Sequence, residues 1–323
     1  MSSRHQRGVA SGDEARAVVC TVRDLVRYAT TRFEAAELSF GHGSAAAFDE
    51  AVYLVLWSLH LPPERLEPFW DARLTATEIS SVLELIERRC RERLPASYLT
   101  GEAWLRGLRF KSDARALVPR SLIAEALDES FPIWLETHPP GAVDWPARVL
   151  DLCTGGGSIA IFAADCFPQA AIVASDCSEA ALELAAENIE LHGCTERIEL
   201  LHGDLYEPLG GQRFDLILCN PPYVNSAAMA ALPPEFLAEP QAALAGGSDG
   251  MDLVRRILAG AVLHLESDGI LLLEIGHEAE HFEQAFPTLE FSYLEVSAGA
   301  RMLVLVTRAQ IAVAIDRTPD CFG

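Results

Sequence analysis

A four-residue motif, Asn220-Pro221-Pro222-Tyr223, has the groups needed to hold a planar nitrogen for reaction. An amide nitrogen is a poor nucleophile because its lone pair is delocalised into the neighbouring carbonyl. If the Asn220 side-chain oxygen and the Pro221 carbonyl each accept one N–H, the lone-pair face of the nitrogen is left free. The two prolines fix the backbone for this task, and Tyr223 can pack against the planar group. We therefore expect Asn220, Pro221 and Tyr223 to act in catalysis and the whole motif, Pro222 included, to bind the acceptor.

A glycine-rich turn lies upstream, where residues 149–157 leave a predicted strand and open a helix at Ser158. Glycines let the backbone approach a ligand without a Cβ in the way. Asp151 stands at the carboxyl end of the strand, where it can hold the amino group of a ligand or, alternatively, only cap the helix. The remaining residues of this predicted nucleoside site are Cys153, Thr154, Gly155, Gly156 and Gly157.

Two further carboxylates follow the next two predicted strands. Asp176 comes about 20 residues after Gly155, where a carboxylate can accept bonds from both ribose hydroxyls. The same arrangement serves a nicotinamide dinucleotide, so a dehydrogenase stays an alternative, as does a simple helix cap. Asp204 is placed to bind an adenine amine while Leu205 packs near the ring, although an Asp-turn without a ligand has the same sequence.

Strands and helices alternate from residue 148 onward, which predicts a mostly parallel sheet covered on both faces. The predicted strands span residues 148–152, 171–175, 198–201, 214–219, 269–275, 291–296 and 302–306. Helices are expected between the first three pairs of strands, with the longest at residues 179–191, and again at 251–265 and 277–285. The last two strands are too close for a helical crossover and must be antiparallel. The fold class is therefore α/β, a seven-stranded, Rossmann-like sheet with one reversed strand, of the kind found in class I S-adenosylmethionine-dependent methyltransferases.

The region before this sheet has a different pattern. Apolar spacing predicts helices over residues 13–93, and Thr75 and Glu78 stand at capping-box spacing before the last of them. A short hairpin is expected within residues 105–118, and a helix over 121–137. We predict four parts: a helical substrate-docking domain, a linker with the hairpin, the catalytic domain and a C-terminal tail, at residues 1–94, 95–120, 121–310 and 311–323.

The composition limits the partners. The 323 residues include 25 basic and 47 acidic ones, for a net charge of −22. Such acidity argues against a broad grip on nucleic acid phosphates and favours a basic protein partner, unless it serves only solubility. The absence of a long apolar run predicts a cytoplasmic protein without a membrane anchor. The eight cysteines form no C-x-x-C pair, and no histidine cluster has zinc spacing, so we expect no metal and no disulfide.

From about Leu94 to its end, the sequence resembles the glutamine side-chain amide (N5) methyltransferases, a family that modifies bacterial release factors and a large-subunit ribosomal protein. The resemblance rests on residues 98–103, 117–121, 151–155 and 220–224. Cys153 and the pair Arg120-Ser121, together with Glu239-Pro240 and residues 250–252, are similar to the branch that methylates a glutamine of ribosomal protein uL3. The release-factor branch usually has glycine in place of Cys153.

The resemblance implies S-adenosylmethionine as cofactor, bound by residues 153–157, Asp176 and Asn220, and a protein glutamine bound by residues 220–223. Pro119 and Arg120 lie in the linker and are expected to line the glutamine site, although an exposed linker arginine is equally compatible with the sequence. Leu205 departs from the release-factor branch, which often has an aromatic residue there. Glu274 and His277 flank the end of the fifth predicted strand and receive no role from the sequence.

Three other functions remain open besides methylation of a release factor. An N6-adenine or N2-guanine methyltransferase faces the same delocalised nitrogen, but the acidity and the lack of a basic, aromatic-rich segment argue against it. A ribosome-assembly factor that binds the cofactor or a ribosomal protein without essential catalysis, and the dehydrogenase, are the others.

Overall fold

The computed structural model describes residues 12–62, 65–137 and 145–322, and it divides into two compact units. The helical unit comprises the described residues up to Ala103 together with Pro233–Ala238. The sheet unit comprises Trp104–Leu232 and the chain from Glu239 onward. The helical unit therefore takes one short segment from a loop whose two ends both lie in the sheet unit.

The helical unit packs amphipathic helices around an apolar core that includes Leu25, Phe33, Leu54 and Leu83. Its elements are α1 (Gly12–Val18), α2 (Val22–Ala35), α3 (Ala47–Ser58), η1 (Glu67–Phe69), α4 (Ala76–Glu92), α5 (Ala96–Thr100) and α11 (Pro234–Leu237). The predicted capping box opens α4: the Thr75 hydroxyl accepts from the Glu78 amide at 3.3 Å, and the Glu78 carboxylate accepts from the Thr75 amide at 2.7 Å. The chain leaves this unit in β1 (Glu102–Leu105), which pairs with β2 (Leu108–Lys111) in a hairpin slightly earlier than the sequence predicts.

A buried charge cluster ties α11 to the rest of the helical unit. Arg89 of α4 is fully buried, and its Nε donates to Glu50 of α3 at 2.7 Å. A terminal nitrogen of Arg89 lies 3.7 Å from the carboxylate of Glu235 in α11, and Arg93 reaches the same carboxylate at 2.8 Å. Two guanidinium groups thus neutralise two carboxylates in the interior, where an unpaired charge is costly.

The sheet unit contains the predicted seven-stranded sheet, in the order β5-β4-β3-β6-β7-β9-β8. Its strands are β3 (Arg148–Leu152), β4 (Ala171–Asp176), β5 (Ile198–His202), β6 (Phe214–Cys219), β7 (Leu265–Glu274), β8 (Ser292–Val296) and β9 (Gly299–Thr307). Only β9 is reversed, and it is antiparallel to β7 and to β8. The predicted fold class and the antiparallel pairing of the last two strands are confirmed.

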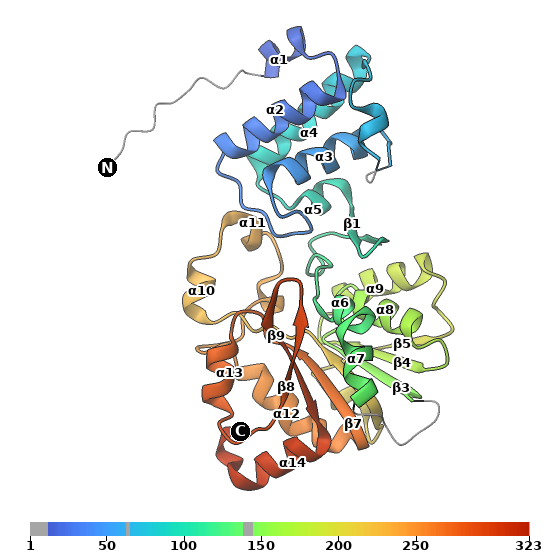
Figure 1. The fold of residues 1–323 in the computed structure, drawn as a ribbon, viewed down its shortest axis with the longest axis vertical. Coiled ribbons are helices and arrows are strands. Elements are labelled where there is room, and N and C mark those ends of the chain that lie inside the picture. Colours follow the sequence, from blue (N-terminus) through green and yellow to red (C-terminus); the bar gives the residue numbers. More distant parts are fainter. Residues whose placement is uncertain (1–11, 63–64, 138–144, 323) are drawn as a thin grey trace. The chain divides into compact units, whose positions relative to one another are not determined.

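Helices cover both faces of this sheet (Figure 1). Strand residues are buried against them on either face. One face packs against α6 (Ile123–Asp128), α7 (Ser130–Thr137), α8 (Ser158–Cys166) and α9 (Glu179–Leu191), and the other against α12 (Asp252–His264), α13 (Ala279–Ala285) and α14 (Arg308–Arg317). The loops add α10 (Ser226–Ala230), η2 (Glu207–Leu209), η3 (Gln241–Ala243) and η4 (Pro319–Cys321). No helix in the described ranges is long and apolar enough to cross a membrane.

Two predicted helices differ in the structure. The helix expected over residues 121–137 is interrupted, and its second half restarts at Ser130 because Pro132, which lacks an N–H, fits in the first turn of a helix but not in its interior. Between β5 and β6 the chain forms only the short η2, since Pro208 and Gly210 leave no run of helix-forming residues. Both differences come from proline or glycine at positions where apolar spacing alone suggests a helix.

The expected C-terminal tail also differs, because most of it is ordered as α14 and η4. A capping box begins α14, with the Thr307 hydroxyl accepting from the Gln310 amide at 3.3 Å. Ile311 and Ala314 are fully buried against the sheet. These residues therefore extend the core of the sheet unit.

Replacing Arg89 with methionine should destabilise the helical unit strongly, because Glu50 would stay buried without its cation and Glu235 would keep only Arg93. We expect a loss of about 3 to 5 kcal/mol in the free energy of opening of this unit, measured by hydrogen exchange of the α3 and α4 amides. Arg91→Met is the matched control, since the Arg91 side chain is 69% exposed and pairs only at the surface. Its effect should stay within about 1 kcal/mol. Equal exchange rates in the two variants would contradict this prediction.

Candidate active site

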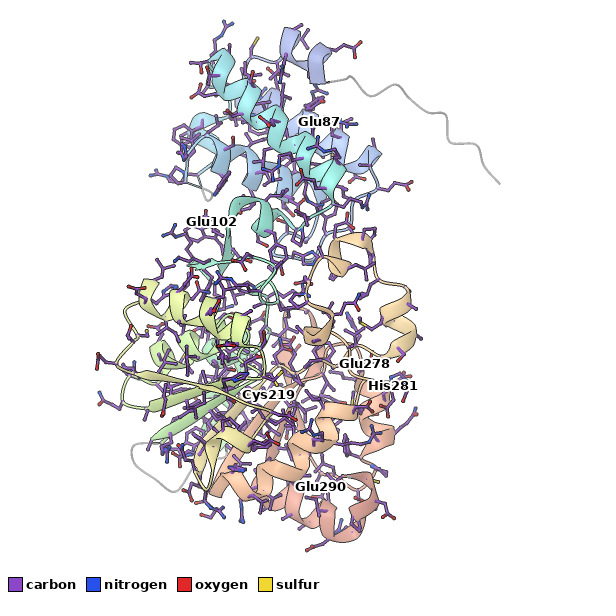
Figure 2. The ribbon with its side chains drawn as sticks, turned by 180° about the vertical axis from the view of Figure 1, so that it is seen from behind. Glu87, Glu102, Cys219, Glu278, His281 and Glu290 are labelled. Carbon is purple, nitrogen blue, oxygen red and sulfur yellow. The ribbon has the colours of Figure 1, made fainter. Side chains whose placement is uncertain are left out.

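The parallel register of three neighbouring strands brings the predicted site residues to one edge of the sheet. Leu152, the last residue of β3, lies opposite Ser175 of β4 and opposite Cys219 of β6. The residues that follow these strand ends therefore meet at the carboxyl edge, which is where ligands bind in such sheets. Figure 2 marks this edge by Cys219, which is fully buried at the end of β6.

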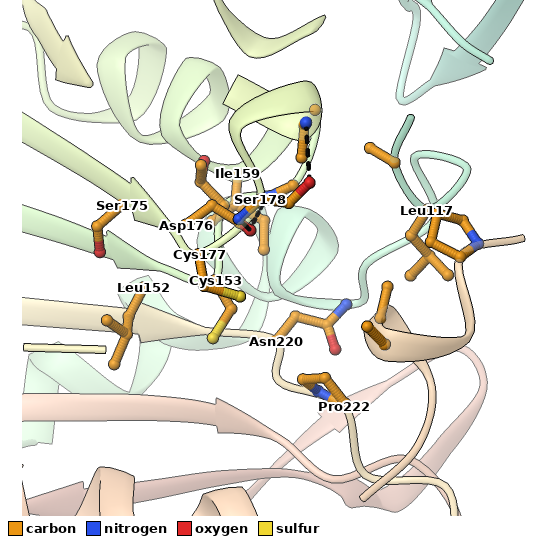
Figure 3. A pocket seen from close by; sticks show the side chains of 18 of the residues that line it. Leu117, Leu152, Cys153, Ile159, Ser175, Asp176, Cys177, Ser178, Asn220 and Pro222 are labelled. Atoms are coloured by element: carbon orange, nitrogen blue, oxygen red, sulfur yellow. Dashed lines mark hydrogen bonds between the residues drawn. The ribbon is translucent and has the colours of Figure 1, made fainter. Parts of the chain in front are cut away.

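A cavity of about 250 Å³ opens at this edge, within the sheet unit (Figure 3). The predicted site residues that line it are Arg120, Cys153, Thr154, Gly155, Gly156, Asp176, Asp204, Leu205, Asn220 and Pro222. Four others, Asp151, Gly157, Pro221 and Tyr223, do not line it. Sequence reasoning did not anticipate that so much of the wall comes from the linker, at residues 115–121, and from residues 240–245.

Asp151 lies behind the glycine turn and is fully buried. One of its oxygens accepts from the Thr154 hydroxyl at 2.5 Å and from the Ala160 amide at 2.9 Å. Its other oxygen has no hydrogen-bond partner among the residues that the structure describes. Burial raises the pKa of Asp151 to about 7, against the lowering effect of its two donors. Asp151 thus joins the turn to the first turn of α8.

The turn itself depends on left-handed backbone, with φ of 63° at Cys153, 55° at Gly155 and 82° at Gly157. A Cβ on Gly157 would lie 3.1 Å from the side chain of Ala185 in α9. The third glycine therefore lets α8 pack closely on α9, which explains why it faces away from the cavity.

Asp176 faces the cavity and also holds the turn in place. Its carboxylate accepts from the Gly155 amide through one oxygen and from the Ser178 amide through the other, each at 2.9 Å. The side-chain cap of α9 is Ser178, whose hydroxyl accepts from the Ala181 amide at 3.2 Å. Because a carboxylate offers about four acceptor sites, Asp176 has free lone pairs for a ligand.

Asp204 stands at the rim of the cavity. Its side chain is 49% exposed, and one oxygen accepts from Arg256 at 2.7 Å. Leu205 beside it is buried and has a left-handed φ of 50°. This pair therefore offers an apolar surface with a partly engaged carboxylate next to it.

Asn220 leaves β6 with its side chain directed into the cavity (Figure 3). Within the described part of the chain, the Asn220 side-chain amide makes no hydrogen bond. Tyr223 turns the other way: its hydroxyl donates to Glu274 at 3.2 Å, and its ring is so close to Gly276 that a Cβ there would lie 2.5 Å from it. The ring of Tyr223 therefore supports the motif from behind, whereas the sequence predicts that it packs on the acceptor.

Arg120 is not an exposed linker residue, since only 21% of its side chain is accessible. Its guanidinium donates to both oxygens of the Glu239 carboxylate, at 3.1 and 2.8 Å, and the Val118 amide donates to Glu239 at 3.0 Å. Sequence reasoning assigned no role to Glu239 or Glu274. For Glu274 the sequence does contain a sign of a structural role, because a carboxylate ends the apolar run of β7, where a buried charge requires hydrogen-bond partners.

Most of the chain is similar to known proteins. Residues 126–251 match the family model described as the methyltransferase small domain. The ribosomal protein uL3 glutamine methyltransferase of Bordetella pertussis is 55% identical over 291 residues, which are 90% of this chain and 96% of that protein. The enzyme of the same name from Burkholderia pseudomallei is 52% identical over 90% of this chain and 95% of that protein.

The chain belongs to the ribosomal protein uL3 glutamine methyltransferase family. Among solved structures, a methyltransferase from Pyrococcus furiosus aligns with a TM-score of 0.43 at 19% identity, over 63% of this chain and 90% of that one. Membership in the family makes this protein an S-adenosylmethionine-dependent methyltransferase.

The cavity fits that cofactor by its chemistry. Asp176 presents free acceptor sites to ribose hydroxyls, the backbone of Gly155 and Gly156 is open to a ligand, and Leu205 provides an apolar surface. Carboxylates at this edge suit a cationic sulfonium. The described residues contain no group of three or more metal-binding side chains.

We expect acid pH to stabilise the sheet unit, because the protonated carboxyl of the buried Asp151 is favoured in the folded chain. Its pKa is about 7 in the folded chain and 3.8 when unperturbed, so its contribution to stability is complete below pH 3.8 and is lost as the pH rises through 7. Relative to Asp151→Asn, the free energy of unfolding should increase by roughly 1.4 kcal/mol for each unit by which the pH falls between these two values. Urea unfolding at several pH values measures it. Asp165→Asn, at an exposed position, is the control, and a pH-independent difference between wild type and Asp151→Asn would refute the prediction.

Proposed function

We propose that this protein transfers the methyl group of S-adenosylmethionine to the side-chain amide nitrogen, N5, of a glutamine in ribosomal protein uL3. The observation that carries the proposal is the free side-chain amide of Asn220, directed into the cavity that Asp176 also lines. Asn220 can hold a delocalised nitrogen in this cavity, and Asp176 can accept hydrogen bonds from the hydroxyls of a ribose. The family membership supplies the acceptor class, since the relatives named above are uL3 glutamine methyltransferases.

The cofactor would be held by residues from three strand ends. The backbone of residues 153–157 approaches it, Asp176 accepts from its ribose hydroxyls, and Asp204 with Leu205 takes the adenine. Asp151 acts indirectly by shaping the glycine turn. When bound, the cofactor supplies an electrophilic methyl group.

The acceptor amide would be held by the motif after β6. The side-chain oxygen of Asn220 would accept one N–H, and the carbonyl of the adjoining Pro221, which does not line the cavity here, would accept the other once the acceptor is bound. These two bonds orient the lone-pair face of the nitrogen toward the methyl group. Pro222 and Arg120 line the space around the glutamine side chain. The nitrogen becomes acidic once methylated, so its proton passes to Asn220 or to water without a strong base. Proximity and orientation then provide most of the rate enhancement.

A basic ribosomal protein suits the acidity of the chain. The net charge of −22 attracts a cationic partner and disfavours broad contact with nucleic acid. We assign docking of this partner to the helical unit and the reaction to the cytoplasm, where ribosomal proteins are made.

The substrate can be tested by incubating the enzyme with labelled cofactor and, separately, uL3, release factors, ribosomal RNA and DNA. We expect label in uL3 alone, with mass spectrometry placing one added methyl group on a glutamine side chain. Label in a release factor would keep the amide chemistry but change the substrate. Label only in RNA or DNA would exclude the protein amide.

Asn220→Ala should lower kcat for uL3 methylation by roughly a hundredfold or more, because the acceptor nitrogen loses its orientation. The affinity for S-adenosylmethionine, measured by calorimetry, should change less than about fivefold, since most of the proposed cofactor contacts come from residues 153–157, Asp176 and Asp204. Asn225→Ala is the matched control, because that side chain caps α10 and binds Glu278 outside the cavity. Asn220→Ala with normal turnover would contradict the proposed role.

A further inference from the structure

Three chain segments that are distant in sequence form the end of the cavity that is proposed to hold the acceptor amide. They are residues 117–121 from the linker, 220–224 after β6, and 239–246 in the following loop, and each contributes lining residues. None of them is a long regular element, so contacts between the segments must fix their relative positions.

Glu239 and Val224 make two of the three possible links between these segments. Glu239 joins the third segment to the first through the Val118 amide and Arg120. The backbone of Val224 joins the second segment to the third, since its amide donates to the Leu244 carbonyl at 2.8 Å and its carbonyl accepts from Gly246 at 2.9 Å.

Glu274 makes the remaining link, between the first and the second segment. It ends β7, where Leu273 lies opposite Cys219, so the chain places it beside the start of the motif. One oxygen of its carboxylate accepts from the Ser121 hydroxyl at 2.7 Å and from the Leu122 amide at 3.0 Å. The other accepts from the Tyr223 hydroxyl.

Burial of the Glu274 carboxyl costs free energy, and specific hydrogen-bond donors offset that cost. The residue is 4% exposed and follows three leucines of β7. Burial raises the pKa of its carboxyl, which the donors Ser121, Leu122 and Tyr223 and the nearby Arg120 counteract. An apolar residue would end this strand at lower cost, so the contacts of Glu274 serve something other than the sheet.

We propose that Glu274 is a positioning residue for methyl transfer, which holds Tyr223 and the Ser121–Leu122 backbone so that Asn220 and the Pro221 carbonyl face the acceptor nitrogen. The inference rests on the proposed glutamine methylation. Glu274 does not line the cavity, so it acts through Tyr223, Ser121 and Leu122 and does not itself touch the substrate.

The test compares Glu274→Ala, Glu274→Gln and Tyr223→Phe in the full chain, with uL3 as acceptor. Glu274→Ala should lower kcat by roughly a hundredfold, while the KM for uL3 and the affinity for S-adenosylmethionine change less than about threefold. Glu274→Gln should recover kcat to within about fivefold of wild type, because its oxygen still accepts from Ser121 and Leu122 while its NH₂ donates to Tyr223. Tyr223→Phe should lower kcat about tenfold and add nothing when combined with Glu274→Ala.

Asp215→Ala controls for a merely structural effect. Asp215 also accepts two backbone amides, from Ala147 and Arg148 at 2.9 Å, but at the amino ends of β3 and β6. We expect it to lower the melting temperature without changing kcat. The inference is overturned if Glu274→Ala keeps wild-type kcat, or if its kcat falls no further than that of Asp215→Ala at equal thermal loss. Inactive wild-type enzyme on uL3 would instead overturn the proposed function.

Discussion

The parallel pairing of β3 with β4 and β6 is the constraint on which the chemistry of this protein depends. Leu152 is paired with Ser175 on one side and with Cys219 on the other. The residues that follow them, Cys153, Asp176 and Asn220, therefore lie at the same edge of the sheet. A slip of one residue would turn each strand's side chains to the opposite face and bury the site residues in the sheet. The helices that cover both faces secure this register, since each strand buries apolar residues in two directions.

Carboxylates stabilise the walls of the cavity through hydrogen bonds, in addition to lining it. Asp151 and Asp176 accept from backbone amides of the glycine turn and of α8, and Glu239 and Glu274 accept from the backbone amides of Val118 and Leu122. Part of the large acidic excess is therefore architectural, which composition alone does not distinguish from a solvated or partner-binding surface. Surface charge remains available for a basic partner because these four groups are mostly turned inward.

The sequence predicts the sheet well because its strands are buried on both faces and appear as short apolar runs between turn residues. The ranges expected for β3, β6 and α9 agree with the structure to the residue, and the reversed strand follows from the length of one loop. The orientation of Tyr223 and the hydrogen-bond partners of Glu274 could not be predicted from the sequence. They depend on contacts between Ser121, Tyr223 and Glu274, and spacing along the chain carries no information about such distant pairs.

The segment Pro233–Ala238 limits how freely this architecture can be cut and recombined. It begins ten residues after Tyr223, belongs to the helical unit, and is followed by Glu239, where the chain is again part of the sheet unit. Its Glu235 finds both cations, Arg89 and Arg93, only there. The helical unit is therefore not an exchangeable module: a chimera that replaces it must also replace this segment, or retain both arginines.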